Sequence, residues 1–279
     1  MQWKANIYLY KVKISRISRI TMNDKLKNTL LRAIHAGAEV LTHFFEGTFE
    51  IESKDTLNNL VTEADKKSED AIIEVIKTDF PEHFILSEEV GELSTSSQYK
   101  WIIDPIDGTV NFAHGIPICC ISIGLEYQGA MLMGAVFNPF MKEMFFAEIG
   151  QGAFLNNRPI KVSAKKSIES ACLVTGFPYK WAQIDIDPIP VFERFIRKGL
   201  PVRRLGSAAI DLCWVAAGRF DGFWEYNLNP WDIAAGYLIV SEAGGRISNF
   251  KGEPYSIYDK QTLATNGILH EDMLRLINE

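Results

Sequence analysis

The stretch WIIDPIDGT, residues 101–109, decides how this chain folds and where its chemistry lies. Its apolar start, residues 101–103, predicts a buried strand that delivers Asp104 at its C-terminal end, where open α/β sheets place ligand sites. Pro105 fixes φ and has no N–H to donate, so we expect the chain to turn there at once. Residues 107–109 are typical of the opening of a short helix, whose first N–H groups attract anions.

This short loop is rich in oxygen atoms that can bind a hard metal ion. Asp104 and Asp107 supply two carboxylates, Ile106 supplies a backbone carbonyl, and Thr109 supplies a hydroxyl. Oxygen ligands of this kind suit Mg²⁺ rather than zinc. The alternative for the loop taken alone is an Asx-turn followed by a helix cap.

Further acids follow apolar strands or open helices elsewhere in the chain. LVTEAD puts Asp65 in the first turn of a predicted helix, and ILSEEVGE puts Glu88 and Glu89 after a predicted strand. FWEYNLNPWD supplies Glu225 at a strand end and Asp232 at a helix start. One such acid is often only compensation of a helix dipole. Several together favour convergence on one sheet edge, where bound cations make crowded carboxylates tolerable.

Composition and charge narrow the class of protein. With 279 residues, 47% hydrophobic and 23% charged, the chain is expected to bury a large core. Net charge is −6, yet residues 1–21 carry basic side chains and no acid, so the remainder is more acidic still and nucleic acid is not an expected partner. The longest uncharged stretch, residues 109–125, contains Asn111, Gly115 and Pro117, so no membrane partner is expected. The four cysteines lack C-x-x-C spacing, which favours a soluble protein of the reducing cytoplasm.

Periodicity divides the chain into three parts. Residues 1–21 are expected to form a basic extension without a catalytic role, residues 22–160 an α+β half with most of the acids described above, and residues 161–279 an α/β half in which strands and helices alternate. A hairpin is expected at Gln128-Gly129. The predicted helices are 23–46, 62–80, 190–197, 208–217, 231–243 and 270–277, and the predicted strands are 84–87, 100–104, 118–127, 129–138, 143–149, 171–177, 201–205, 221–226 and 262–266.

Five stretches in this order closely resemble the inositol monophosphatase family, which belongs to the lithium-sensitive, metal-dependent phosphatases related to fructose-1,6-bisphosphatase. They are LVTEAD, SEEVGE, WIIDPIDGT, GSAAIDLCWVAAGRFDGFWE and NPWDIAAGYLIVSEAGG, and the likeness runs from about Asp24 to the C-terminus. The resemblance implies a layered αβαβα sandwich, a homodimer, and hydrolysis of a small phosphate monoester such as inositol 1-phosphate. Lithium sensitivity is implied as well.

The resemblance also implies roles for individual residues. Two or three Mg²⁺ ions per active site would be held by Glu88, Asp104, the Ile106 carbonyl, Asp107 and Asp232. Asp65 and Thr109 would orient and deprotonate the attacking water, with Glu88 also in a catalytic role. Gly108 and Thr109 would bind the phosphate through N–H groups, and Asp107, Ala208 and Glu225 would contact substrate hydroxyls. Lys54 would lie on a loop near the third metal.

Several alternatives remain open. Fructose 1,6-bisphosphate, histidinol phosphate and 3′-phosphoadenosine compounds are the other substrates that such a scaffold takes. An aspartyl-phosphate phosphatase would place its two acids two residues apart, whereas Asp104 and Asp107 are separated by three. A non-catalytic regulatory relative would be free to lose ligands, and every inferred ligand is present. The glycines Gly150 and Gly152 favour a turn over a dinucleotide loop.

Overall fold

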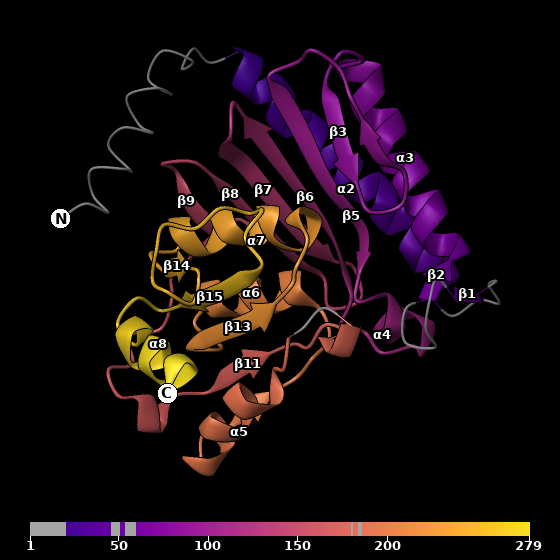
Figure 1. The fold of residues 1–279 in the computed structure, drawn as a ribbon. Helices are drawn as coiled ribbons and strands as arrows, with labels where there is room; N and C mark the ends of the chain where they lie inside the picture. The colour runs from indigo at the N-terminus through magenta and orange to yellow at the C-terminus, as the bar shows by residue number, and fades with distance from the viewer. Residues whose placement is uncertain (1–20, 46–50, 54–59, 180, 184–185) are drawn as a thin grey trace.

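The computed structural model describes residues 21–45, 51–53, 60–179, 181–183 and 186–279, which form alternating layers of helix and sheet (Figure 1). The predicted αβαβα sandwich of mixed α+β and α/β type is confirmed. Each helix of the three helical layers lies close to a predicted one. The first layer holds α2 (Thr21–Phe44) and α3 (Glu63–Asp79), the central layer α6 (Ala208–Ala216) and α7 (Pro230–Glu242), and the last layer α5 (Ile189–Arg197) and α8 (His270–Asn278).

An eight-stranded sheet lies between the first and central helical layers. Its strand order is β10 (Arg158–Ile160), β9 (Gly152–Leu155), β8 (Glu143–Glu148), β7 (Ala130–Asn138), β6 (Cys120–Tyr127), β5 (Tyr99–Asp107), β3 (Phe84–Ser87) and β4 (Gly91–Leu93). The predicted hairpin joins β6 to β7, and its turn residues Gln128 and Gly129 have φ of 51° and 81°, as a two-residue turn matched to the strand twist requires. Because β3 and β5 are parallel neighbours, the acids at their C-terminal ends share one edge of the sheet.

A five-stranded sheet lies between the central and last helical layers. Its order is β12 (Val202–Arg203), β11 (Leu173–Thr175), β13 (Gly222–Tyr226), β15 (Gln261–Thr265) and β14 (Arg246–Ser248). Strand β11 is parallel to β12 and β13, as alternation of strand and helix predicts. Strand β15 instead runs antiparallel to both β13 and β14. The sequence pattern did not predict the short strand β14, which forms the sheet edge. Because β15 follows β14 and pairs with it antiparallel, β15 also runs antiparallel to β13.

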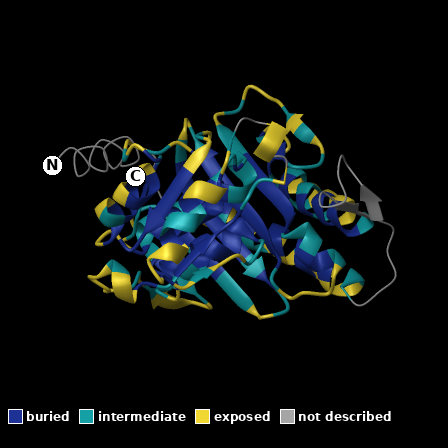
Figure 2. Cartoon of the chain, turned by 60° about the horizontal axis from the view of Figure 1, so that its bottom comes forward, coloured by how far each residue is buried: buried dark blue, intermediate teal, exposed yellow. Residues whose placement is uncertain are grey.

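Helix α7 packs closely on the eight-stranded sheet. It is apolar on nearly all sides and belongs to the core between the two sheets, where Figure 2 shows buried residues concentrated. The close approach depends on two strand glycines: a Cβ at Gly124 would lie 2.7 Å from Ala234 Cβ, and a Cβ at Gly134 would lie 2.8 Å from Ala235 Cα. Because Asp232 lies in the first turn of α7, this packing holds a carboxylate near the sheet edge where β5 ends.

The remaining elements are short. They are α4 (Thr109–Ala113), the 3₁₀ turns at Ile168–Ser170 and Trp181–Gln183, and an antiparallel pair of β1 (Ile51–Ser53) and β2 (Leu60–Thr62). Lys54 and residues 1–20 of the expected basic extension lie outside the described residues. None of the helices in the described ranges combines the length and apolar character needed to cross a membrane.

Candidate active site

Strand β5 brings two carboxylates to one face through an irregularity in its pairing. The predicted turn at Pro105 is wrong, because the strand continues through Pro105 to Asp107 before α4 begins. Asp104 pairs with Ser122 and Asp107 pairs with Cys120, so three steps along β5 face two steps along β6. Residues two apart in a strand point to the same face, and the extra residue in β5 therefore returns Asp107 to the face that Asp104 occupies.

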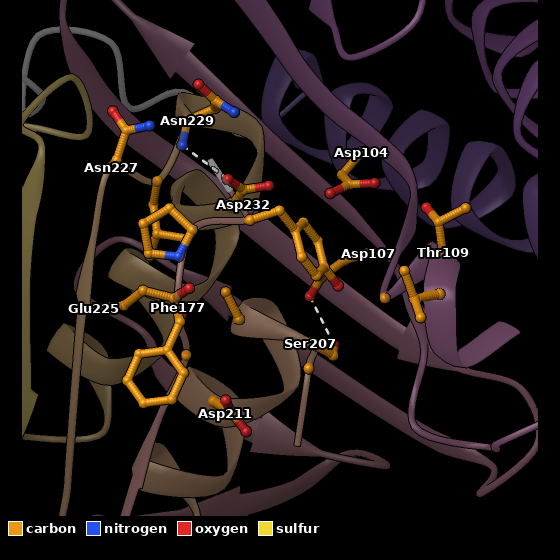
Figure 3. Close-up of a pocket in the computed structure, with 18 of the residues that line it drawn as sticks. Asp104, Asp107, Thr109, Phe177, Ser207, Asp211, Glu225, Asn227, Asn229 and Asp232 are labelled. Atoms are coloured by element: carbon orange, nitrogen blue, oxygen red, sulfur yellow. Dashed lines mark hydrogen bonds between the residues drawn. The ribbon is translucent and has the colours of Figure 1, made fainter. Parts of the chain in front are cut away.

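Asp232 completes a cluster of three carboxylates. It is in the first turn of α7, where its Oδ2 accepts a hydrogen bond of 2.7 Å from Asn229 N in a capping box. One carboxylate oxygen each from Asp104, Asp107 and Asp232 lies within 4.8 Å of the others. The structure thus brings Asp232 beside the two acids of β5, which are far from it in the sequence (Figure 3).

The electrostatics of this cluster fit a divalent cation. Burial, followed by the negative charges of Glu88, Asp107, Asp232 and Asp65, raises the pKa of Asp104 well above its usual range. Burial and the charge of Asp107 raise the pKa of Asp232 to about 7. Crowded buried carboxylates of this kind are destabilised when ionised unless positive charge is brought among them. A donor set made of carboxylate oxygens suits Mg²⁺.

The two other expected metal ligands lie beside the cluster. Glu88 directly follows β3, donates its backbone N–H to Ile103 O at 3.3 Å, and lines the same cavity as Asp104. Ile106 also lines this cavity, and its carbonyl accepts a hydrogen bond of 2.9 Å from Thr109 Oγ1. Glu88 and the Ile106 carbonyl are therefore placed near the three carboxylates by the ends of β3 and β5.

Asp65 and Thr109 form the pair that the family resemblance implies. Asp65 is buried in the first turn of α3, and its Oδ1 lies 3.2 Å from Thr109 Oγ1. The next turn of α3 is joined to β5 by Ser68, whose hydroxyl donates to Pro105 O at 3.1 Å. Helix α3 therefore fixes the position of the Asp65 carboxylate relative to the Thr109 hydroxyl.

Gly108 is required by the close packing of three chain segments. Its φ of 91° lies in the left-handed region, and it precedes α4 as the N-cap. A Cβ at this position would lie 2.9 Å from Ile118 O and 3.2 Å from Gly206 O. Any side chain here would force the loop away from its neighbours and displace the N–H groups at the start of α4.

The acids surround a cavity of about 370 Å³, a size typical of small-molecule sites. The cavity is lined by most of the expected site residues and by others that the sequence did not single out. The expected ones are Glu88, Asp104, Ile106, Asp107, Gly108, Thr109, Ala208, Glu225 and Asp232, and the others include Phe177, Arg204, Ser207, Asp211, Asn227 and Asn229. Asp65 contacts the site through Thr109.

Glu225 lies at the end of the cavity away from the β5 bulge (Figure 3). It is at the end of β13 and nearly buried, and burial followed by the charge of Asp232 raises its pKa well above its usual range. Gly176 makes room for it, because a Cβ there would lie 2.1 Å from Glu225 Oε2. The carboxylate therefore occupies a space that this glycine keeps open.

Sequence reasoning missed three polar residues of the site. Ser207 donates a hydrogen bond of 2.7 Å to Asp107 Oδ2, Asn229 is the N-cap of α7 and donates its backbone N–H to Asp232 Oδ2, and Asp211 lines the cavity near Glu225. Asn229 is part of the quoted NPWD stretch, and its position three residues before an acid is the signal of a capping box. Asp211 also had a signal, since it is the one charged residue in the helix AAIDLCWVA.

Fold and site together define a class: layered αβαβα sandwiches whose acid cluster, at one end of a small-molecule cavity, suits a metal ion. The model of the inositol monophosphatase family matches residues 22–279. An inositol-1-monophosphatase of Synechocystis is 45% identical over 239 residues, which cover 85% of this chain and 83% of the relative. The protein named Nus factor SuhB of Pseudomonas aeruginosa is 41% identical over 232 residues, which cover 81% and 85% respectively. The chain therefore belongs to the inositol monophosphatase family.

Solved structures agree with this assignment. The inositol monophosphatase from Anabaena matches with a TM-score of 0.83 and 37% identity, covering 92% of this chain and 97% of that one. A more distant structure, with a TM-score of 0.77 and 26% identity over 92% of this chain and 95% of that one, is an IMPase/NADP phosphatase complexed with Mg²⁺ and phosphate.

Proposed function

We propose that this chain hydrolyses the phosphate monoester of a small polyol in a Mg²⁺-dependent reaction, with inositol 1-phosphate as the leading substrate. The observation that carries the proposal is the approach of Asp104, Asp107 and Asp232 within 4.8 Å at one end of a cavity that Glu225 lines at the other. A small phosphate ester in this cavity would have its phosphate at the cation site and its hydroxyl groups near the Glu225 carboxylate. The dimensions of the cavity suit a substrate of this size.

Two or three Mg²⁺ ions would be held by the acids already described. Asp104, Asp107 and Asp232 are the nearest ligands to one another, with Glu88 and the Ile106 carbonyl beside them. When bound, the ions neutralise charge on the transferring phosphoryl group and lower the pKa of water.

The chain's own residues would position the reactants and move one proton. Thr109 Oγ1, 3.2 Å from Asp65 Oδ1, would take a proton from the attacking water as its own passes to the carboxylate. The N–H groups of Gly108 and Thr109 would hold the phosphate so that the water attacks in line with the leaving oxygen. The polyol would lie against Asp107, Ala208 and Glu225, whose acceptors match hydroxyl groups.

A screen of phosphate release from about twenty monoesters, with Mg²⁺ and with chelator, tests the proposal. We expect turnover only with Mg²⁺ and the highest kcat/KM with inositol 1-phosphate. Fructose 1,6-bisphosphate, histidinol phosphate and 3′-phosphoadenosine compounds belong in the same screen, because a preference for one of them would replace inositol 1-phosphate on the same scaffold. Turnover that persists in chelator would contradict the assigned metal chemistry.

The relative named Nus factor SuhB favours a second candidate, a non-catalytic regulatory protein. Every acid expected in the metal site is nevertheless present in this chain and lines the cavity. Absence of Mg²⁺-dependent turnover across the whole screen would favour the regulatory role.

We also propose the homodimer that the family resemblance implies. Large apolar side chains are exposed around α5, where a partner surface would cover them: Tyr179, Trp181, Ile189 and Ile196. Light scattering on the purified chain should give twice the mass of 31.5 kDa. A monomer across micromolar concentrations would exclude the dimer.

A further inference from the structure

Asp211 is a buried acid for which the roles assigned above give no explanation. Its residue exposure is 1%, and its Oδ1 has no hydrogen-bond partner within the described part of the chain. Buried carboxylate oxygens normally have partners, since the loss of water is otherwise uncompensated. Asp211 also lines the cavity that holds the metal cluster and Glu225. An acceptor of this kind, buried in the wall of a binding cavity, points to a ligand group as its partner.

The surroundings of Asp211 define what that group is. Asp211 belongs to the first turn of α6, and Figure 3 shows its carboxylate below that of Glu225, which comes from β13. Burial and then the charge of Glu225 raise the pKa of Asp211, whereas Arg204 at the cavity rim acts in the opposite direction. Two acceptors side by side, with one cation near them, suit neutral groups that donate hydrogen bonds rather than a second phosphate.

Asp211 differs from Asp221, another buried aspartate, which directly precedes β13. Asp221 is equally buried, but its carboxylate accepts hydrogen bonds from Ser163 Oγ at 2.5 Å and Cys172 N at 2.7 Å and pairs with Lys165 at 3.2 Å. Asp221 is therefore satisfied within the protein and does not line the cavity. The contrast separates an acid that stabilises the fold from one that is left for a ligand.

We propose that Asp211 is a specificity-determining residue that accepts a hydrogen bond from a substrate hydroxyl different from the one that Glu225 binds. This inference rests on the proposed phosphatase function and deepens it, since two acceptors select esters of polyols with at least two free hydroxyls on the side away from the phosphate. A monoester with an aromatic leaving group offers neither hydroxyl and gains nothing from either acid.

The test compares kcat/KM for inositol 1-phosphate with kcat/KM for phenyl phosphate in saturating Mg²⁺. Asp211→Asn keeps the shape of the side chain and removes its charge, Asp211→Ser is a second variant with a smaller side chain, and Asp221→Asn is the matched control. We expect Asp211→Asn to lower the inositol 1-phosphate value by about tenfold or more, through KM, and to leave phenyl phosphate within twofold. Asp221→Asn should lower the melting temperature while the ratio of the two substrates stays that of the wild type.

A double variant distinguishes direct contact from an effect on Glu225. If each acid binds its own hydroxyl, Asp211→Asn should cost about tenfold in the Glu225→Gln background too, because independent contacts add. No further loss in that background would mean that Asp211 acts only by positioning Glu225, and would overturn the proposal. An unchanged substrate ratio in both Asp211 variants, with an active wild type, would overturn it as well. Failure of the wild type on both esters would instead reject the phosphatase function, and this inference with it.

Discussion

Asp107 Oδ2 lies 2.7 Å from Ala209 N, so a carboxylate at the end of β5 caps helix α6. Ser207 Oγ donates to the same oxygen at 2.7 Å. Negative charge at a helix N-terminus is stabilised by the helix dipole and by free N–H groups. One oxygen of Asp107 is thus used to join the eight-stranded sheet to the central helices, while Asp107 also belongs to the acid cluster.

Ser207→Ala should weaken Mg²⁺ binding without unfolding the protein. The variant removes one donor that orients the Asp107 carboxylate, and loss of such an outer partner typically costs about 10-fold to 100-fold in metal affinity. The measurement is turnover as a function of Mg²⁺ concentration. Ser241→Ala is the control, because its hydroxyl bonds Tyr237 O within α7 at 2.8 Å. An unchanged Mg²⁺ requirement in Ser207→Ala would show that the other donors to Asp107, Ala209 N and Cys120 Sγ among them, are enough to orient it.

Glu225→Gln should weaken polyol phosphates selectively. The Glu225 carboxylate is expected to accept hydrogen bonds from substrate hydroxyls without binding metal, so its neutralisation should cost about 1 to 3 kcal/mol in transition-state stabilisation. An aryl phosphate should be spared. Equal losses with both substrates would indicate that Glu225 supports the metal site.

Local sequence patterns predicted the regular elements well and the site geometry less well. The long helices α2 and α3 follow from apolar spacing, α7 follows from the alternation of strand and helix, and the β6–β7 hairpin follows from Gln128-Gly129. Pro105 predicted a turn, yet its strand continues because β5 pairs with β6 again at Asp107, beyond the end of the β3 pairing at Ile103. The missing N–H of Pro105 lies at the irregularity in the β6 pairing, where a ladder bond is already interrupted.

The candidate site was predicted where its residues follow ordered motifs and missed where it depends on contacts between layers. Asp104, Asp107 and Asp232 each occur in a recognisable stretch. Asp211 stands out as the one charged residue of its helix, but its position near Glu225 depends on the contact of α6 with β13, which no local pattern contains. The cap that Asp107 provides to α6 likewise depends on a contact between elements distant in the sequence.

Deletion of residues 1–21 should leave turnover unchanged. These residues carry basic charge of one sign and no motif of the site, and the family match begins at residue 22. The comparison is kcat/KM of the full and shortened chains in the same buffer, with solubility measured alongside. A tenfold loss would show that the extension contributes to the site.

His270 should make the protein less stable in mild acid. It is fully buried between Ser248 Oγ (2.8 Å from Nε2) and Thr265 Oγ1 (2.9 Å from Nδ1), and burial followed by the charge of Arg246 lowers its pKa to about 3. An unfolded histidine titrates near 6.5, so the stability from neutral His270 is fully present above pH 6.5 and is lost progressively as pH falls toward 3.

The size of this effect is measurable by urea unfolding at pH 8 and pH 5. The His270 contribution to the free energy of unfolding should fall by about 2 kcal/mol between those values. His270→Gln removes the titration, so its stability should be lower at pH 8 but change less between the two conditions. The difference between the proteins isolates His270 from carboxylates such as Asp232, whose raised pKa acts in the opposite direction. Parallel curves for the two proteins would contradict the assignment.

Asp104→Asn should abolish activity and leave the fold intact. Asp104 is the most central acid of the cluster, since the charges of Glu88, Asp107, Asp232 and Asp65 all raise its pKa. Asparagine keeps the shape and can still accept the hydrogen bond that Ile106 N donates to Oδ1 at 3.0 Å. Without the negative charge, ligation of metal should fail, and turnover should fall by at least about a thousandfold, the scale of several kcal/mol of lost charge stabilisation.

The stability of the same variant tests the electrostatic reasoning without any turnover. In chelator the wild-type acids repel one another, so Asp104→Asn should melt at the same temperature or slightly higher. In saturating Mg²⁺ the wild type should gain stability by mass action, and the variant should gain much less. The two melting temperatures of each protein, measured with its turnover, complete the experiment. Activity within tenfold of the wild type, or a drop of many degrees in chelator, would mean that Asp104 supports the bulge of β5 instead of holding metal.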